Sequence, residues 1–155
     1  MAILTITSNS AERTQQIGLL LGKLVQPGDV LLLSGNLGSG KTCLTQGIAR
    51  GLGINEYTLS PTFVLIREYY GRLPLYHIDL YRLNDSQDML NIGLDDYLYS
   101  DGVCVIEWAE KGIPVLPHDN LLVKLVYISE NERKLTFEPH GEHYDQLLKL
   151  LAQKL

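Results

Sequence analysis

Apolar residues recur along the chain with two different periods, and these periods predict both strands and helices. The segment 3–7 favours a short first strand, and leucine and isoleucine recur at helical spacing between residues 11 and 24. Ser8 or Ser10 can cap the start of that helix. The apolar run 30–34 is typical of a strand that is buried on both faces of a parallel sheet.

The same patterns continue to the end of the chain and predict an α/β fold. The further expected elements are a helix that ends at about Leu52, strands at 62–69, 75–79 and 103–106, weaker helices at 85–90 and 92–99, a hairpin of strands 121–129 and 133–138, and a closing helix after Gly141. We therefore expect a single domain over residues 1–155. Its sheet should be mixed and mostly parallel, flanked by helices and extended by antiparallel hairpins.

Composition and charge narrow the class of protein. The chain has 155 residues, of which 45% are hydrophobic and 20% are charged, as in a soluble globular domain. Its net charge is −5 and its basic residues are scattered singly, which argues against direct binding of nucleic acid and favours a protein partner. Cys43 and Cys104 form no disulfide framework, and no apolar run is long enough to span a bilayer, so we expect a cytoplasmic protein.

The stretch SGNLGSGKTCL, residues 34–44, carries the clearest chemical signal. Residues 35–42, called the phosphate loop below, fit the pattern G-x-x-x-x-G-K-[ST] between a buried strand and a helix. Glycines let successive backbone N–H groups turn inward at the helix N-terminus, where they form a nest for an anion. The residues expected to bind a nucleotide are Gly38, Ser39, Gly40, Lys41 and Thr42.

Two side chains of this loop have distinct expected roles. Lys41 supplies a positive charge to the β- and γ-phosphates, and the hydroxyl of Thr42 can ligate Mg²⁺. We also expect Lys41 to be an exposed loop residue, whose replacement lowers nucleotide affinity and leaves the fold intact.

Such a site also needs a carboxylate at the end of an apolar strand, close to the metal or its waters. Glu107 closes the apolar run 103–106, and Asp79 lies at the end of another expected strand. His77 and Asp79 share one face of that strand because they are two residues apart. A hydrogen-bonded structural pair is the favoured interpretation of these two residues, over a metal-binding or catalytic pair.

Two further residues have open roles at this stage. Thr62, in the stretch SPTF, could sense the γ-phosphate and Mg²⁺ as switch threonines do, or could belong to a loop that enters a strand. Trp108 follows Glu107 and could either pack in the core or help to form the site.

The sequence excludes several classes of nucleotide-binding protein. It has no Asn-Lys-x-Asp segment, which a GTPase needs to recognise guanine, and no arginine cluster typical of a kinase lid. An AAA-type machine needs a longer chain. A compact ATPase that acts on another protein is the favoured function, and a small-molecule kinase and a nucleotide-gated scaffold are the alternatives.

The motifs together resemble the TsaE (YjeE) family, the ATPase of bacterial tRNA threonylcarbamoyladenosine biosynthesis. The resemblance runs from about residue 8 to residue 138. The blocks that carry it are the phosphate loop with Gln46-Gly47, Ser60-Pro61-Thr62-Phe63, His77-Ile78-Asp79-Leu80-Tyr81-Arg82-Leu83, Ile92-Gly93-Leu94 and Ile106-Glu107-Trp108-Ala109-Glu110.

The resemblance implies a P-loop NTPase fold and a cytoplasmic, Mg²⁺-dependent ATPase that is slow alone. It would act with the TsaD and TsaB proteins, after TsaC or an equivalent enzyme has made threonylcarbamoyl-AMP. That complex transfers the threonylcarbamoyl group to N6 of adenosine 37 in tRNAs that read ANN codons. ATP hydrolysis would reset the complex between turnovers.

The resemblance also implies roles for individual residues. Lys41 would bind phosphates, Thr42 and Glu107 would bind Mg²⁺, and Asp79 would lie near the metal or the attacking water. Thr62 would be the switch residue, and Trp108 would support the strand end at Glu107.

One residue of the loop region departs from the family pattern. Cys43 stands where the family often has a second threonine, so a hydroxyl contact is lost while the backbone N–H can still reach the α-phosphate. The resemblance places the adenine pocket near the start of the first helix and the hairpin at Arg133.

Overall fold

One mixed sheet organises the chain. The computed structural model describes residues 2–36, 38–56 and 65–155. In this part of the chain the strands are β1 (Leu4–Ser8), β2 (Val30–Ser34), β3 (Ile66–Tyr70), β4 (Pro74–Asp79), β5 (Val103–Glu107), β6 (Asn120–Tyr127) and β7 (Arg133–His140). They follow the order β1-β7-β6-β2-β5-β4-β3 across the sheet.

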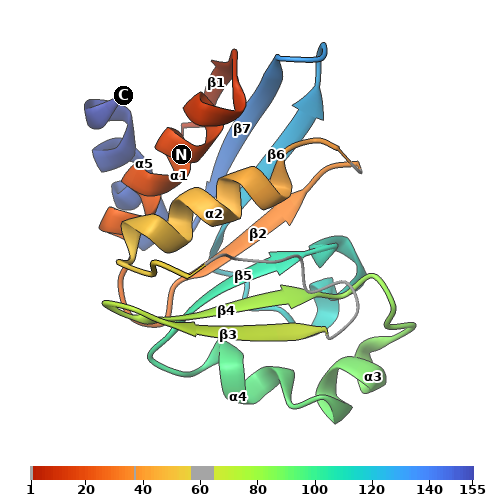
Figure 1. The fold of residues 1–155 in the computed structure, drawn as a ribbon. Coiled ribbons are helices and arrows are strands. Elements are labelled where there is room, and N and C mark those ends of the chain that lie inside the picture. The colour runs from red at the N-terminus through yellow and green to blue at the C-terminus, as the bar shows by residue number, and fades with distance from the viewer. Residues whose placement is uncertain (1, 37, 57–64) are drawn as a thin grey trace.

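The four central strands β6, β2, β5 and β4 are parallel. Strands β1 and β7 on one side and β3 on the other side pair antiparallel. The expected mixed α/β sheet is therefore confirmed, with its parallel part at the centre. The expected hairpin is the β6–β7 pair (Figure 1).

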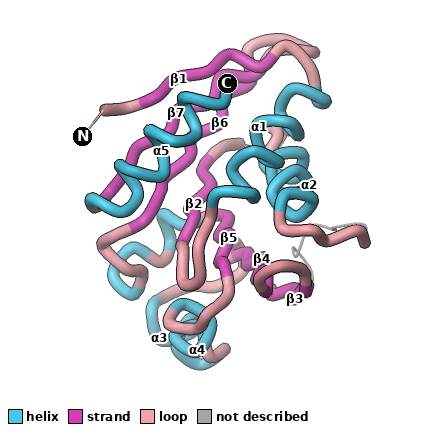
Figure 2. Tube along the Cα trace, turned by 90° about the vertical axis from the view of Figure 1, so that its left-hand side faces the viewer, coloured by secondary structure: helices cyan, strands magenta, loops and turns pink. Residues whose placement is uncertain are grey.

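Helices cover both faces of this sheet (Figures 1 and 2). The helices are α1 (Ala11–Leu24), α2 (Lys41–Gly51), α3 (Ser86–Asn91), α4 (Leu94–Leu98) and α5 (Glu142–Lys154), with short 3-10 turns at Ala109–Lys111 and Ile113–Val115. Helices α1, α2 and α5 lie on one face, and α3 and α4 lie on the other. None of the helices in the described ranges is both long enough and apolar enough to cross a membrane.

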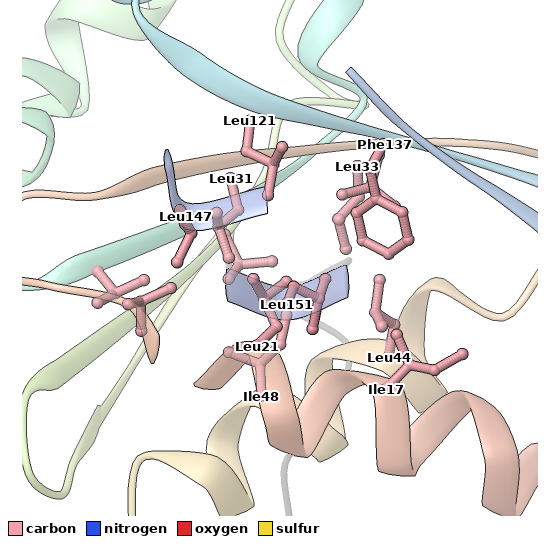
Figure 3. Close-up of a cluster of buried hydrophobic side chains, with 14 of the residues drawn as sticks. Ile17, Leu21, Leu31, Leu33, Leu44, Ile48, Leu121, Phe137, Leu147 and Leu151 are labelled. Carbon is pink, nitrogen blue, oxygen red and sulfur yellow. The ribbon is translucent and has the colours of Figure 1, made fainter. Parts of the chain in front are cut away.

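Two apolar clusters fill the space between the sheet and these helices. Successive strand residues point to opposite faces, so Leu31 and Leu33 join the cluster under α1, α2 and α5, while Val30 and Leu32 join the cluster over α3 and α4. This explains why β2 is continuously apolar. Figure 3 shows the first cluster, in which Leu44 of α2 packs between the strands and α1.

Element boundaries differ from expectation where local geometry intervenes. Ser10, and not Ser8, caps α1, because its Oγ accepts a hydrogen bond of 3.0 Å from the backbone N–H of Arg13. The helix expected from residue 92 begins at Leu94, because Gly93 adopts a left-handed φ of 78°. Of the strand expected at 62–69, residues 62–64 lie outside the described residues and β3 starts at Ile66.

Glycine backbones bring α1 and α2 unusually close together. A Cβ atom on Gly18 or Gly22 of α1 would lie 2.4 or 2.2 Å from a carbonyl oxygen of α2. In return, a Cβ atom on Gly47 or Gly51 of α2 would lie 2.1 or 2.3 Å from a carbonyl oxygen of α1. A side chain cannot be accommodated by rotation of these neighbours, because the atoms in the way are backbone. On each helix the two glycines are four residues apart and so lie on one face. The contact between these faces holds α2 at one position along α1, which fixes where α2 begins.

The Gly22→Ala variant should be destabilised by about 1–3 kcal/mol, because overpacking against a backbone outweighs the better helix propensity of alanine. Urea denaturation measures the free energy of unfolding. Lys23→Ala is the matched control, since Lys23 is the exposed neighbour of Gly22 and its truncation should change that free energy by less than about 0.5 kcal/mol. Equal stability of the two variants would contradict the tight packing of α1 on α2.

Candidate nucleotide-binding site

The phosphate loop connects the end of β2 to the start of α2. Gly38 and Gly40 adopt left-handed φ values of 81° and 105°, which residues with a Cβ rarely adopt. Gly40 directly precedes the first residue of α2, a helix of 11 residues. The first backbone N–H groups of a helix have no partner within it, so the loop ends at a positively polarised helix N-terminus. This arrangement suits an anionic phosphate group.

Two carboxylates lie at the carboxyl ends of the neighbouring parallel strands. Glu107 of β5 pairs with Leu33 of β2 on one side and with Asp79 of β4 on the other. Both carboxylate side chains are buried, with Asp79 3% and Glu107 4% exposed. Sheet register therefore places them side by side, next to the point where β2 leads into the phosphate loop.

These carboxylates and the loop surround one cavity of about 310 Å³. The residues that line it are Gly38, Ser39, Gly40, Lys41, Thr42, Cys43, Asp79, Glu107, Trp108 and Arg133. The structure thus brings together every site residue that the sequence suggests, apart from Thr62, which lies outside the described residues.

Lys41 is buried, at 8% exposure, so the expectation of an exposed loop residue is wrong. It is the first residue of α2, and its side chain folds back over the loop, where Nζ donates a hydrogen bond of 2.7 Å to the carbonyl oxygen of Gly35. Nζ also lies 3.9 Å from Oε1 of Glu107 and 4.6 Å from the centre of the Trp108 ring. The ammonium group is thus held at the cavity by the phosphate loop on one side and by the end of β5 on the other.

Glu107 and Asp79 have different partners in the protein. Oε2 of Glu107 lies 2.5 Å from Nε2 of His77, and Oδ1 of Asp79 accepts a hydrogen bond of 2.8 Å from the backbone N–H of Tyr81. The expected hydrogen-bonded pair of His77 with Asp79 is therefore wrong. His77 instead pairs with a carboxylate on the neighbouring strand, which spacing along one strand cannot reveal.

Trp108 helps to form the site. Of the two roles that the sequence leaves open, packing in the core or forming the site, the structure supports the second. Trp108 lines the cavity and its ring packs against that of Tyr81, with 4.9 Å between ring centres. Its backbone has a left-handed φ of 57°, which is uncommon for a bulky residue. This turn ends β5 directly after Glu107 and places the indole beside Lys41.

Arg133 connects the phosphate loop to the β6–β7 turn, residues 128–132. Its Nε donates a hydrogen bond of 3.1 Å to the carbonyl oxygen of Gly38. Its Nη1 donates to three carbonyl oxygens in the turn, those of Ser129, Glu130 and Glu132. The guanidinium group also lies 4.5 Å from the centre of the Tyr127 ring.

A second, smaller cavity of about 120 Å³ is also lined by Arg133. It is lined by Ser10, Ala11, Thr14, Gly40, Cys43, Glu130, Asn131 and Arg133. Three of these residues, Gly40, Cys43 and Arg133, also line the larger cavity. The two cavities are therefore adjacent, and the smaller one is formed by the start of α1 and the β6–β7 turn.

The two cysteines have different surroundings. Burial raises the pKa of the Cys104 thiol to about 12, so this residue of β5 stays protonated and acts as a core side chain. Cys43 is half-buried and lines both cavities.

The residues present fit Mg²⁺. This ion is usually held in nucleotide sites by one or two carboxylates and by phosphate oxygens of the nucleotide. Asp79, Glu107 and the hydroxyl of Thr42 all line the larger cavity, next to the loop that suits a phosphate group. These oxygen donors would complete the shell of a metal ion that the phosphates also bind.

Comparison with known proteins identifies relatives that cover most of the chain. A model of the family described as threonylcarbamoyl adenosine biosynthesis protein TsaE matches residues 8–135. The tRNA threonylcarbamoyladenosine biosynthesis protein TsaE of Bacillus subtilis (strain 168) is 43% identical over 143 residues, which cover 92% of this chain and 89% of the relative. The protein of the same name from Treponema pallidum (strain Nichols) is 43% identical over 129 residues, covering 83% of this chain and 96% of the relative.

A solved structure has the same fold. The crystal structure of YdiB from Bacillus subtilis matches with a TM-score of 0.87 and 38% sequence identity, and the match covers 99% of this chain and 96% of that chain. The P-loop NTPase fold that the resemblance implies is therefore confirmed.

Lys41→Met should lower the affinity for ATP about 10- to 100-fold, because a hydrogen bond to a charged group contributes about 1.5–3 kcal/mol. Methionine keeps an apolar stem against Trp108 and removes only the charge. Titration with a fluorescent ATP analogue measures the affinity, and thermal denaturation checks the fold. Lys149→Met on the exposed face of α5 is the control and should bind like the wild type. Unchanged affinity of folded Lys41→Met would show that this cavity is not the phosphate site.

Proposed function

Because this chain belongs to the TsaE family, as the resemblance of its motifs predicts, we propose that it is an ATPase subunit in tRNA threonylcarbamoyladenosine biosynthesis. It acts in the cytoplasm as a single domain together with TsaD and TsaB. Its hydrolysis of ATP resets that complex, which threonylcarbamoylates N6 of adenosine 37 in tRNAs that read ANN codons. The observation that supports this best is the convergence of the phosphate loop, Lys41 and two buried carboxylates on one cavity.

In this proposal the loop and the N-terminus of α2 bind the phosphates of ATP. Lys41 exchanges the carbonyl oxygen of Gly35 for the β- and γ-phosphate oxygens, and the backbone N–H of Cys43 reaches the α-phosphate. Bound Mg²⁺ supplies positive charge that offsets the charge developing on the phosphates. Thr42 and Glu107 would hold the metal, and Asp79 would lie near the metal or the attacking water.

The adenine base lies in the smaller cavity, between the start of α1 and the β6–β7 turn. Arg133 lines both cavities and donates to the carbonyl oxygen of Gly38 as well as to the turn, so it sets the distance between the loop and the turn. Thr62 acts as the switch residue, a role that comes from the resemblance alone.

In this proposal the isolated protein hydrolyses ATP slowly because the guanidinium group of Arg133 is already hydrogen-bonded within the protein. Many P-loop enzymes use a free arginine to stabilise the charge of the transition state, sometimes one supplied by a partner protein. The guanidinium group of Arg133 already donates to one carbonyl oxygen of the phosphate loop and to three of the β6–β7 turn. A partner such as TsaD–TsaB could therefore accelerate hydrolysis by supplying a free arginine to the site.

Glu107→Gln should retain ATP binding and lower the rate of hydrolysis about 100-fold or more, because the neutral amide is a much weaker metal ligand than the carboxylate. Phosphate release and equilibrium binding separate the two effects. Glu110→Gln, an exposed neighbour, is the control and should behave like the wild type. A Glu107→Gln protein that fully supports the tRNA modification in cells would instead favour a nucleotide-gated scaffold.

Purified TsaD and TsaB should increase the turnover of ATP by this protein severalfold or more. Steady-state release of inorganic phosphate, measured with and without the partners, tests this. With γ-labelled ATP and a pool of metabolites, the label should appear only as inorganic phosphate. Full activity without partners would contradict the proposal, and a labelled metabolite would favour a small-molecule kinase.

A further inference from the structure

The two oxygens of the Glu107 carboxylate face different parts of the protein. Oε2 lies 2.5 Å from Nε2 of His77, at the buried side, while Oε1 is the oxygen nearest Lys41, 3.9 Å from Nζ. One oxygen is therefore tied to the sheet, and the other lies on the side of the phosphate loop.

His77 is buried in the sheet next to this carboxylate. It is 1% exposed and lies on β4, opposite Val105 of β5 and Arg67 of β3. Its register position is two residues before the Asp79–Glu107 pair, so it reaches Glu107 diagonally across the two strands. The Cys104 and Ile106 side chains of β5 point to the opposite face of the sheet and do not separate the two groups.

The hydrogen bond defines the tautomer of His77. A neutral imidazole has one donor and one acceptor nitrogen, and an ionised carboxylate only accepts, so the proton lies on Nε2 and is donated to Oε2. The other nitrogen, Nδ1, is buried and has no hydrogen-bond partner among the residues that the structure describes. An apolar side chain at this position would leave the buried Oε2 of Glu107 without a donor, so the hydrogen bond of Nε2 to Glu107 is the contact of His77 that bears on the site.

Glu107 needs such a partner because its side chain is long. It has three rotatable bonds, and it stands at the last residue of β5, directly before the left-handed turn at Trp108. A hydrogen bond to Oε2 removes the rotation that would exchange the two oxygens. Charged groups that act on a developing charge are effective only when they are held in place before the reaction.

We propose that His77 is a positioning residue for ATP hydrolysis, which holds Oε2 of Glu107 through Nε2–H and so keeps Oε1 on the phosphate side of the cavity. This inference rests on the proposed ATPase function. His77 itself does not contact the reacting atoms and does not line the cavity.

Two substitutions separate this role from a structural one. Glutamine carries its Nε2 amide the same number of bonds from Cβ as the histidine Nε2, so His77→Gln keeps a donor for Glu107. Leucine fills a similar volume and cannot donate. Because partners that orient a metal-binding side chain usually contribute about 10- to 100-fold in activity, His77→Leu should lose that factor in kcat for ATP. Its KM for ATP should stay near that of the wild type, and His77→Gln should recover most of kcat.

Leu75→Ala is the matched control for loss of stability. Leu75 is fully buried on the same face of β4, two residues before His77, and does not contact Glu107. It should lower the melting temperature without changing kcat below that temperature. Equal kcat of folded His77→Leu and the wild type would overturn the inference, and so would equal losses in folded His77→Leu and His77→Gln.

A measurement without nucleotide or metal tests the same hydrogen bond. In protein labelled with ¹⁵N-histidine, His77 should show the Nε2–H tautomer, with a proton shifted downfield by the short bond to a carboxylate. Glu107→Gln should move this proton upfield, and Leu75→Ala should leave it in place. An Nδ1–H tautomer in the wild type would overturn the inference, even where His77→Leu does not fold. Absence of ATP hydrolysis by the wild type with its partners would instead contradict the proposed function and leave this signal unchanged.

Discussion

The contact of α1 with α2 through glycine backbones is the constraint on which the site depends. Where both helices lack side chains, carbonyl oxygens of each approach the other to a distance that no Cβ atom would allow. Helix α2 is thereby fixed against α1, and its apolar residues Leu44 and Ile48 lie in the same buried cluster as Leu31 and Leu33 of β2 (Figure 3). The phosphate loop spans only the space between β2 and α2, so its shape follows from where these two elements lie.

The parallel centre of the sheet supplies the second half of the site. In a parallel sheet the carboxyl ends of neighbouring strands meet at one edge, and ligands bind in the crevice beyond them. Strands β2, β5 and β4 end together there, with the phosphate loop after the first and a buried carboxylate on each of the others. The crossover from β2 through α2 thus brings the helix N-terminus next to Glu107 and Asp79.

The charged groups of the cavity are paired with groups of the protein itself. Lys41 donates to the carbonyl oxygen of Gly35, Glu107 accepts from His77, and Arg133 donates to the carbonyl oxygen of Gly38. Each of these bonds orients its side chain, and those of Lys41 and Glu107 also lower the cost of burying a charge. The proposed binding of a nucleotide would therefore be an exchange of partners by side chains that the protein already orients.

The sequence by itself determined the order of strands and helices, the phosphate loop and the family. These features are local: a period of two or 3.6 residues, a cap at a helix start, and a glycine pattern that ends in Lys41-Thr42. Only the tertiary structure decided that Lys41 is buried, that Trp108 lines the cavity, and that His77 pairs with Glu107 and not with Asp79. Those contacts join residues on different strands, and strand order and register depend on packing across the whole chain, which no local pattern contains.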